Sequence, residues 1–244
     1  MDKGTVVIPG RGLGNRLISL AFSKAICKIS LVIWLKNHEC NARYDELFRS
    51  PKFSLGTCAP HVYLRYQDYV NGKSIKEKMH NVLHKIIETG SKPKKIVEFY
   101  KSLKPSKNVE PLILKIPPNT LGIHLRLADH LQMQSEDHFK ERIKNKIKEL
   151  KPKYVFIVSD TQYKKDEIIN DILNKLMPGK VLFNHTNLSN IIQKEMESPD
   201  RNTLEGMQLA TAEMFSLSKC KWILPNSTSS FSLSANLMGS STLL

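Results

Sequence analysis

The sequence predicts an α/β protein built from two facing Rossmann-like domains, each a parallel sheet with flanking helices. Short apolar, β-branched segments alternate with longer helical segments, and a proline pair interrupts this alternation near the middle of the 244-residue chain. Strands of five or six residues separated by helices are typical of βαβ units, whose strands lie parallel. Placing the boundary at Pro117 and Pro118 gives predicted domains of residues 1–118 and 119–244.

The alternation is sharper after the proline pair than before it. In the first half we expect strands over residues 5–9, 31–35 and 61–66 and helices over 15–29, 74–88 and 93–103. In the second half we expect strands over 121–127, 154–159, 180–185 and 222–226 and helices over 136–150, 162–176, 204–218 and from about 229. Ligands of doubly wound sheets bind at the carboxyl ends of the strands, where we expect the motifs to gather.

The formal net charge is +14, and almost all of the excess lies in residues 1–120, which hold 21 Lys and Arg against 9 Asp and Glu. Such a field favours an anionic partner: nucleic acid, a phosphorylated small molecule or an acidic surface. The scattered lysines of residues 73–107 are equally explained as a solvated face.

No apolar segment reaches the roughly 20 residues that a membrane helix needs. We therefore expect no membrane span, and a cytoplasmic protein or a piece separated from its anchor. The four cysteines have no paired or metal-ligand spacing, so we expect buried free thiols.

The first motif is GRGLGNR, residues 10–16, between an apolar run and a predicted helix. Glycines after a strand let the main chain approach a ligand, and the helix start that follows offers unpaired N–H groups. The segment is neither a dinucleotide fingerprint, because Asn15 stands where the third glycine would be, nor a phosphate-binding P-loop. A tight turn with a helix cap explains it as well.

The second motif is IHLRLADH, residues 123–130, at the end of a predicted central strand. Alternation along a strand puts His124 and Arg126 on one face. A guanidinium embedded in an apolar strand needs an anion, and a diphosphate suits its planar fork. The alternatives are a structural ion pair of Arg126 with Asp129 or Asp160, and a core role for His124.

Two further motifs follow predicted strands. Asp160 lies between a strand and a helix, where it either caps the helix or accepts from a ribose or base. The segment LPNSTSSFSLSAN, residues 224–236, clusters hydroxyl side chains at a strand-to-helix turn, which is either an anion site or a helix cap.

The order of these motifs resembles the fucosyltransferase superfamily with the GT-B fold, which includes nodulation, protein O-, α-1,2- and α-1,6-fucosyltransferases. The resemblance spans residues 5–239, although residues 36–115 contain no matching motif. It implies GDP-fucose or another nucleotide-sugar as donor, a glycan acceptor on the N-terminal side and the donor on the C-terminal side. It implies no metal and no other cofactor.

The resemblance also implies roles for individual residues. Arg126 would contact the diphosphate, with His124 beside it, and Asp160 would lie near the nucleoside. The remaining donor-binding residues implied are Gly12, Gly14, Asn15, Arg16, Ser229, Ser230, Phe231 and Ser232. Many relatives have H-x-R-R, whereas Leu127 stands here in place of the second arginine.

These expectations describe an inverting, metal-independent glycosyltransferase. A fixed guanidinium and helix-start N–H groups would stabilise the charge that develops on the leaving diphosphate. Asp129 is the candidate general base, and no D-x-D pair is present to bridge a metal. The alternatives are a basic nucleic-acid-binding protein, for which we find no recognised signature, and a sugar-nucleotide-binding protein without turnover.

Overall fold

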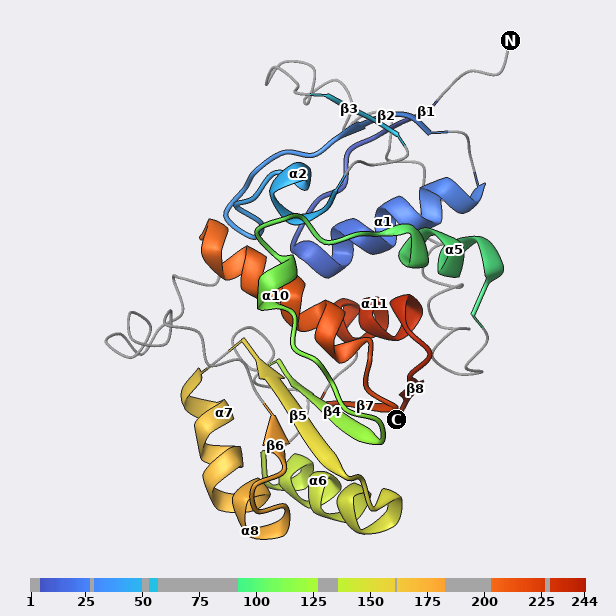
Figure 1. Cartoon of the computed structure of the whole chain (residues 1–244). Helices are drawn as coiled ribbons and strands as arrows, with labels where there is room; N and C mark the ends of the chain where they lie inside the picture. The colour runs from blue at the N-terminus through green and yellow to red at the C-terminus, as the bar shows by residue number, and fades with distance from the viewer. Residues whose placement is uncertain are drawn as a thin grey trace.

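The computed structural model describes residues 5–26, 29–49, 53–56, 92–126, 136–160, 162–182, 203–226 and 229–244. It confirms the predicted α/β fold with parallel sheets flanked by helices (Figure 1). The predicted strand over 61–66 and helix over 74–88 lie outside the described residues, as do Cys27 and Cys58. Cys40 and Cys220 are buried free thiols, as expected.

The first sheet comes from the N-terminal half and has the order β1-β2-β3, with all strands parallel. Its strands are β1 (Thr5–Val7), β2 (Ile29–Ile33) and β3 (Ser54–Gly56). Its helices are α1 (Leu13–Ile26), α2 (Tyr44–Leu47) and α5 (Lys94–Ser102), followed by the 3-10 turn η1 (Glu110–Leu112). The sequence predicted β1, α1, β2 and α5, but not the short elements β3, α2 and η1.

The second sheet comes from the C-terminal half and has the order β6-β5-β4-β7-β8, again all parallel. Its strands are β4 (Thr120–Leu125), β5 (Tyr154–Ser159), β6 (Val181–Leu182), β7 (Trp222–Pro225) and β8 (Thr242–Leu243). Its helices are α6 (Glu136–Leu150), α7 (Gln162–Ile168), α8 (Asn174–Leu176), α10 (Leu204–Leu217) and α11 (Ser230–Met238). A π-helical turn, η2 (Ile169–Leu173), joins α7 to α8 where one continuous helix was predicted.

Strand β4 is the middle strand of this sheet, and every one of its six residues is buried. Its odd-numbered residues, Leu121, Ile123 and Leu125, pack with residues of α6 and α7 in one cluster. On its other face Gly122 packs so tightly against Leu217 and Cys220 that α10 lies directly on the strand. His124 shares this second face, which α11 also covers.

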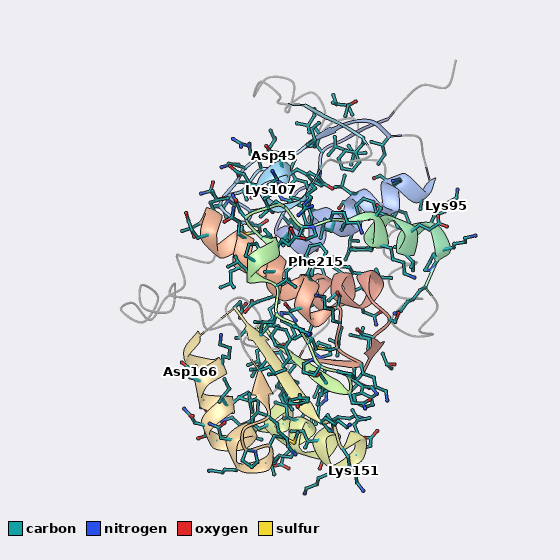
Figure 2. The ribbon with its side chains drawn as sticks, viewed as in Figure 1. Asp45, Lys95, Lys107, Lys151, Asp166 and Phe215 are labelled. Carbon is teal, nitrogen blue, oxygen red and sulfur yellow. The ribbon has the colours of Figure 1, made fainter. Side chains whose placement is uncertain are left out.

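A single hydrophobic cluster joins the two halves of the chain. In it α1 and α5 pack against α11, and α11 packs against α10, so that these helices lie between the two sheets (Figure 1). The hydroxyls of Tyr100 and Ser234 are 2.9 Å apart across this layer. Phe215, labelled in Figure 2, lies within it, with its ring centroid 6.3 Å from that of Phe48.

A membrane-spanning helix is not found in the part of the chain that the structure describes. The longest helix there, α6, has 15 residues, many of them charged.

Candidate active site

The carboxyl ends of three neighbouring strands meet at one edge of the second sheet. From β4 the chain proceeds to β5 and β6 on one side, and later to β7 and β8 on the other. The backbone N–H of Asp160 donates to Leu125 (3.3 Å), and that of Asn226 donates to His124 (3.1 Å). Ligands of doubly wound sheets bind where the strand order reverses in this way, and His124 and Arg126 stand at that point.

His124 is buried beneath the start of α11. Its Nδ1 lies 2.5 Å from the hydroxyl of Ser232, and its ring stacks on Phe231 with 4.9 Å between centroids. Burial, helped by the positive charge of Arg126, lowers the pKa of His124 to about 3. The imidazole is therefore neutral at ordinary pH, and its contact with Ser232 fixes the orientation of the ring.

The start of α11 presents its N–H groups to the same edge. Ser229 is the N-cap, and its hydroxyl accepts from the N–H of Phe231 at 3.2 Å. Within the described residues the hydroxyl of Ser230 has no hydrogen-bond partner, and the first turn of α11 contains no acidic side chain. The positive end of the helix dipole is thus not neutralised by the helix itself.

A second helix start lies against the first. Helix α1 begins inside the glycine segment, and a Cβ built on Gly14 would be 2.8 Å from both the backbone N of Phe231 and the backbone C of Ser230. Gly12 is not packed in this way, because its Cβ would lie 3.7 Å from the carbonyl of Glu39. The first turn of α1 also contains no acidic residue, so two positive helix ends meet here.

Arg16 lies in the N-terminal core with 1% of its surface exposed. It donates through Nε to the carbonyl of Arg11 (2.7 Å) and through Nη1 to that of Leu35 (2.5 Å), and its guanidinium lies 5.0 Å from the centre of the Trp34 ring. Arg11 has a left-handed backbone (φ 63°). These hydrogen bonds connect the glycine-containing segment, residues 10–16, to the chain just after β2.

Asn15 follows Gly14 in the first turn of α1 and is half-buried. Its carbonyl accepts from the hydroxyl of Ser19 at 2.9 Å. In the described parts of the chain its side-chain amide has no hydrogen-bond partner, so the amide remains able to bind a ligand.

Comparison with known proteins identifies the architecture. No family model and no curated protein matches the chain. Among solved structures, fucosyltransferase NodZ from Bradyrhizobium matches 97% of this chain and 94% of its own, with 15% identity and a TM-score of 0.59. Arabidopsis thaliana FUT1, crystallised as the R284K mutant with GDP, matches over 100% of this chain and 70% of its own, at 14% identity and a TM-score of 0.58.

This chain has the fold of the fucosyltransferases. POFUT1 in complex with GDP also has this fold, matching 99% of this chain and 97% of its own at 14% identity and a TM-score of 0.53. A NodZ crystal soaked with GDP-fucose superposes equally well as the one above, with a TM-score of 0.59.

Within this fucosyltransferase fold, the structure brings most of the predicted residues together. Contacts join His124 to Phe231 and Ser232, and Gly14 to Ser230. Arg126 and Asp160 stand on adjacent strand ends of the same edge. Asp129 lies outside the described residues, so its role as general base stays a prediction.

Two residues at this edge were not among those predicted for the fucosyltransferase-like site. Asn226 uses its side-chain amide to pair with the backbone of Arg126. Arg142 of α6 donates at 3.5 Å to the carbonyl of Pro225, so a second guanidinium lies at the carboxyl end of β7. Asn226 had a sequence signal, since it ends a predicted strand just before the serine-rich turn, whereas Arg142 lies in an ordinary amphipathic helix.

Proposed function

We propose that this protein is an inverting, metal-independent glycosyltransferase that moves a deoxysugar, fucose from GDP-fucose, to a glycan acceptor. The observation that carries the proposal is the convergence at one sheet edge of Arg126, the start of α11 and the start of α1. Each contributes positive charge, and no acidic side chain occupies the first turn of either helix. Together they suit a pyrophosphate.

The diphosphate is the part of the donor that this arrangement fits best. The guanidinium of Arg126 can hold two phosphate oxygens, while the hydroxyl of Ser230 and the first N–H groups of α11 can hold others. Asn15 would approach from the N-terminal half. Asp160, at the end of β5, would accept from the nucleoside.

The chemistry requires the C–O bond between the sugar and the diphosphate to break while the acceptor hydroxyl attacks the opposite face of the ring. Negative charge then grows on the leaving diphosphate, and fixed positive groups stabilise it more in the transition state than in the ground state. Losing one such donor typically costs about 3 kcal/mol of transition-state stabilisation. Asp129 would accept the proton of the acceptor hydroxyl as it attacks.

Neutral His124 has a supporting role. Because Ser232 contacts Nδ1 and Phe231 covers the ring, the imidazole is fixed beneath the start of α11 rather than free to shuttle protons. The low pKa of about 3 means that His124 adds no positive charge at neutral pH. Its second nitrogen has no hydrogen-bond partner among the described residues, so it can serve as a ligand contact.

The decisive experiment is a thermal-shift series with GDP, GDP-fucose, UDP-glucose, dTDP-rhamnose and CMP-sialic acid. We expect only the guanosine ligands to bind and therefore to raise Tm. A ligand at about 100 times its Kd stabilises the native state by about 2.7 kcal/mol. Arg126→Ala should abolish the shift, whereas Arg43→Ala, which removes an exposed arginine paired with Asp45, should leave it unchanged.

The transfer assay then separates an enzyme from a binding protein. Release of GDP from GDP-fucose in the presence of glycan acceptors, with and without EDTA, should show acceptor-dependent turnover that EDTA does not reduce. GDP binding without turnover would favour a non-catalytic sugar-nucleotide-binding protein. A Tm that responds to no nucleotide, together with salt-dependent binding of random oligonucleotides that Arg126→Ala leaves unaffected, would instead support a nucleic-acid-binding protein.

A further inference from the structure

Asn226 makes three hydrogen bonds to the end of β4. Its backbone N–H donates to the carbonyl of His124 at 3.1 Å. Its side-chain Oδ1 accepts from the backbone N–H of Arg126 at 2.9 Å, and its Nδ2 donates to the carbonyl of Arg126 at 3.1 Å. The residue is 8% exposed, so these bonds are sheltered from water.

The register explains why the side chain has this position. His124 pairs with Pro225 at the end of the β4 and β7 ladder. If the parallel ladder continued, the N–H of Arg126 would bond to the carbonyl of residue 226, and the carbonyl of Arg126 would accept from the N–H of residue 228. The amide of Asn226 makes both bonds instead, and therefore substitutes for one further step of the sheet.

Because the Asn226 side chain replaces these ladder bonds, β4 and β7 can separate while the backbone of Arg126 stays hydrogen-bonded. Beyond Asn226 the chain must leave the sheet, because Ser229 already caps α11. On the other side of β4, the N–H of Asp160 donates to the carbonyl of Leu125 at 3.3 Å. Hydrogen bonds from residues at the ends of β5 and β7 thus fix the backbone at Leu125 and Arg126.

We infer that Asn226 is a positioning residue for Arg126: its amide fixes the Arg126 backbone, and hence the point from which the guanidinium reaches the donor diphosphate. This inference rests on the proposed function for its catalytic consequence. The positioning itself rests only on the hydrogen bonds and the register.

Few other side chains can take this role. Aspartate keeps the acceptor for the Arg126 N–H but sets a second oxygen against the Arg126 carbonyl. Alanine removes the side-chain partner of both the Arg126 N–H and the Arg126 carbonyl. Glutamine has an additional methylene that moves the amide out of register.

The experiment compares Asn226→Ala and Asn226→Asp with Asn236→Ala. Asn236 is also buried, and its amide donates to the carbonyl of Ser241 (2.7 Å) at the opposite end of α11, so its variant controls for loss of a buried amide. Hydrogen exchange of the Arg126 amide should accelerate in Asn226→Ala, less in Asn226→Asp, which keeps an acceptor for that N–H, and not in Asn236→Ala. Asn226→Asp, which is isosteric, keeps the test open should Asn226→Ala fail to fold.

Kinetics and GDP titration give the second measurement. We expect the Asn226 variants to lose about 10- to 100-fold in kcat with a smaller change in KM, the range found when residues that orient the ligands of a catalytic metal are mutated. In an Arg126→Ala background, adding Asn226→Ala should change kcat by less than about twofold, because the residue acts through Arg126. Asn236→Ala should not affect turnover.

The outcomes separate the two proposals. Unchanged exchange at Arg126, or equal and additive losses of kcat in the presence and absence of Arg126, would overturn the positioning role while the glycosyltransferase proposal stands. Accelerated exchange in a protein that binds no nucleotide would overturn the proposed function and leave the positioning role in place.

Discussion

Gly14 at the start of α1 lies directly against Ser230 at the start of α11. A Cβ on Gly14 would be 2.8 Å from the Ser230 Oγ, and equally close to the backbone C of Ser230 and the backbone N of Phe231. The hydroxyl can rotate away, but the two backbone atoms cannot. The absence of a side chain at residue 14 is what allows the starts of two helices, one from each half of the chain, to meet.

Gly14→Ala should therefore separate these helix starts. We expect a loss of about 1–3 kcal/mol of unfolding free energy from overpacking, and a GDP-induced rise in Tm much smaller than that of the wild type. Gly10→Ala is the matched control, because a Cβ on Gly10 would meet no atom within 4 Å. Equal nucleotide responses from the two variants would show that the close approach does not matter for binding.

Much of this arrangement could be predicted from the sequence because it depends on local pattern. The alternation in LGIHLRL places His124 opposite Ile123 and Leu125, and the structure confirms it. The meeting of Gly14 with Ser230 could be expected only through a family resemblance, since 216 positions separate the residues and no periodicity connects them.

Two residues have contacts that the sequence pattern does not reveal. An arginine beside glycines at a helix start suggests an anion ligand, yet Arg16 donates to backbone carbonyls in the core. Asn226 at a strand end suggests only the end of pairing, whereas its amide prolongs the ladder by one step. Each role depends on backbone atoms that become neighbours only in the folded chain.

Arg16 gives the next prediction. Arg16→Ala should lower the unfolding free energy by about 2–4 kcal/mol, because the carbonyls of Arg11 and Leu35 lose the buried guanidinium that donates to them and the Trp34 ring loses its cation–π contact. Urea unfolding of the variant gives the number, with the exposed Arg43→Ala as control. At a temperature where the variant is folded, GDP affinity within about threefold of wild type would assign Arg16 to the fold; loss of binding by far more would assign it to the donor.

The low pKa of His124 predicts how the free energy of unfolding changes at acidic pH. Its pKa falls from 6.5 to about 3 on folding, so the unfolded chain takes up a proton first as the pH drops. Its contribution to stability is therefore complete above about pH 6.5 and is lost, by up to about 1.4 kcal/mol per pH unit, as the pH falls towards 3.

The test compares His124→Asn with wild type by urea unfolding between pH 4 and 7. The variant should be less stable at pH 7 but should lose less stability on acidification. The exposed His38→Asn is the control for the loss of an imidazole. If His124→Asn and the wild type lose the same amount of stability on acidification, the imidazole does not keep its neutral form in the folded state.

The raised pKa of Glu213 predicts the opposite pH dependence: its contribution to the free energy of unfolding falls as the pH rises. It lies in α10 with 8% of its surface exposed, and its carboxylate has no hydrogen bond in the described parts of the chain. Burial raises its pKa from 4.5 to about 7, although the positive charge of Lys165 opposes the rise. The folded chain keeps this proton to a higher pH than the unfolded chain does, so the stability that it provides is complete below about pH 4.5 and falls as the pH rises to about 7.

Glu213→Gln removes this dependence, since the amide has a similar shape and no charge to bury. We expect Tm of the variant to exceed that of the wild type at pH 8 by several degrees and the difference to shrink towards pH 5, because only the ionised carboxylate is costly in the core. Glu205→Gln changes an exposed carboxylate in the first turn of the same helix and should show no such pH-dependent gain. A Glu213→Gln protein that is less stable than the wild type at pH 8 would mean that attraction to Lys165 exceeds the cost of burying the carboxylate.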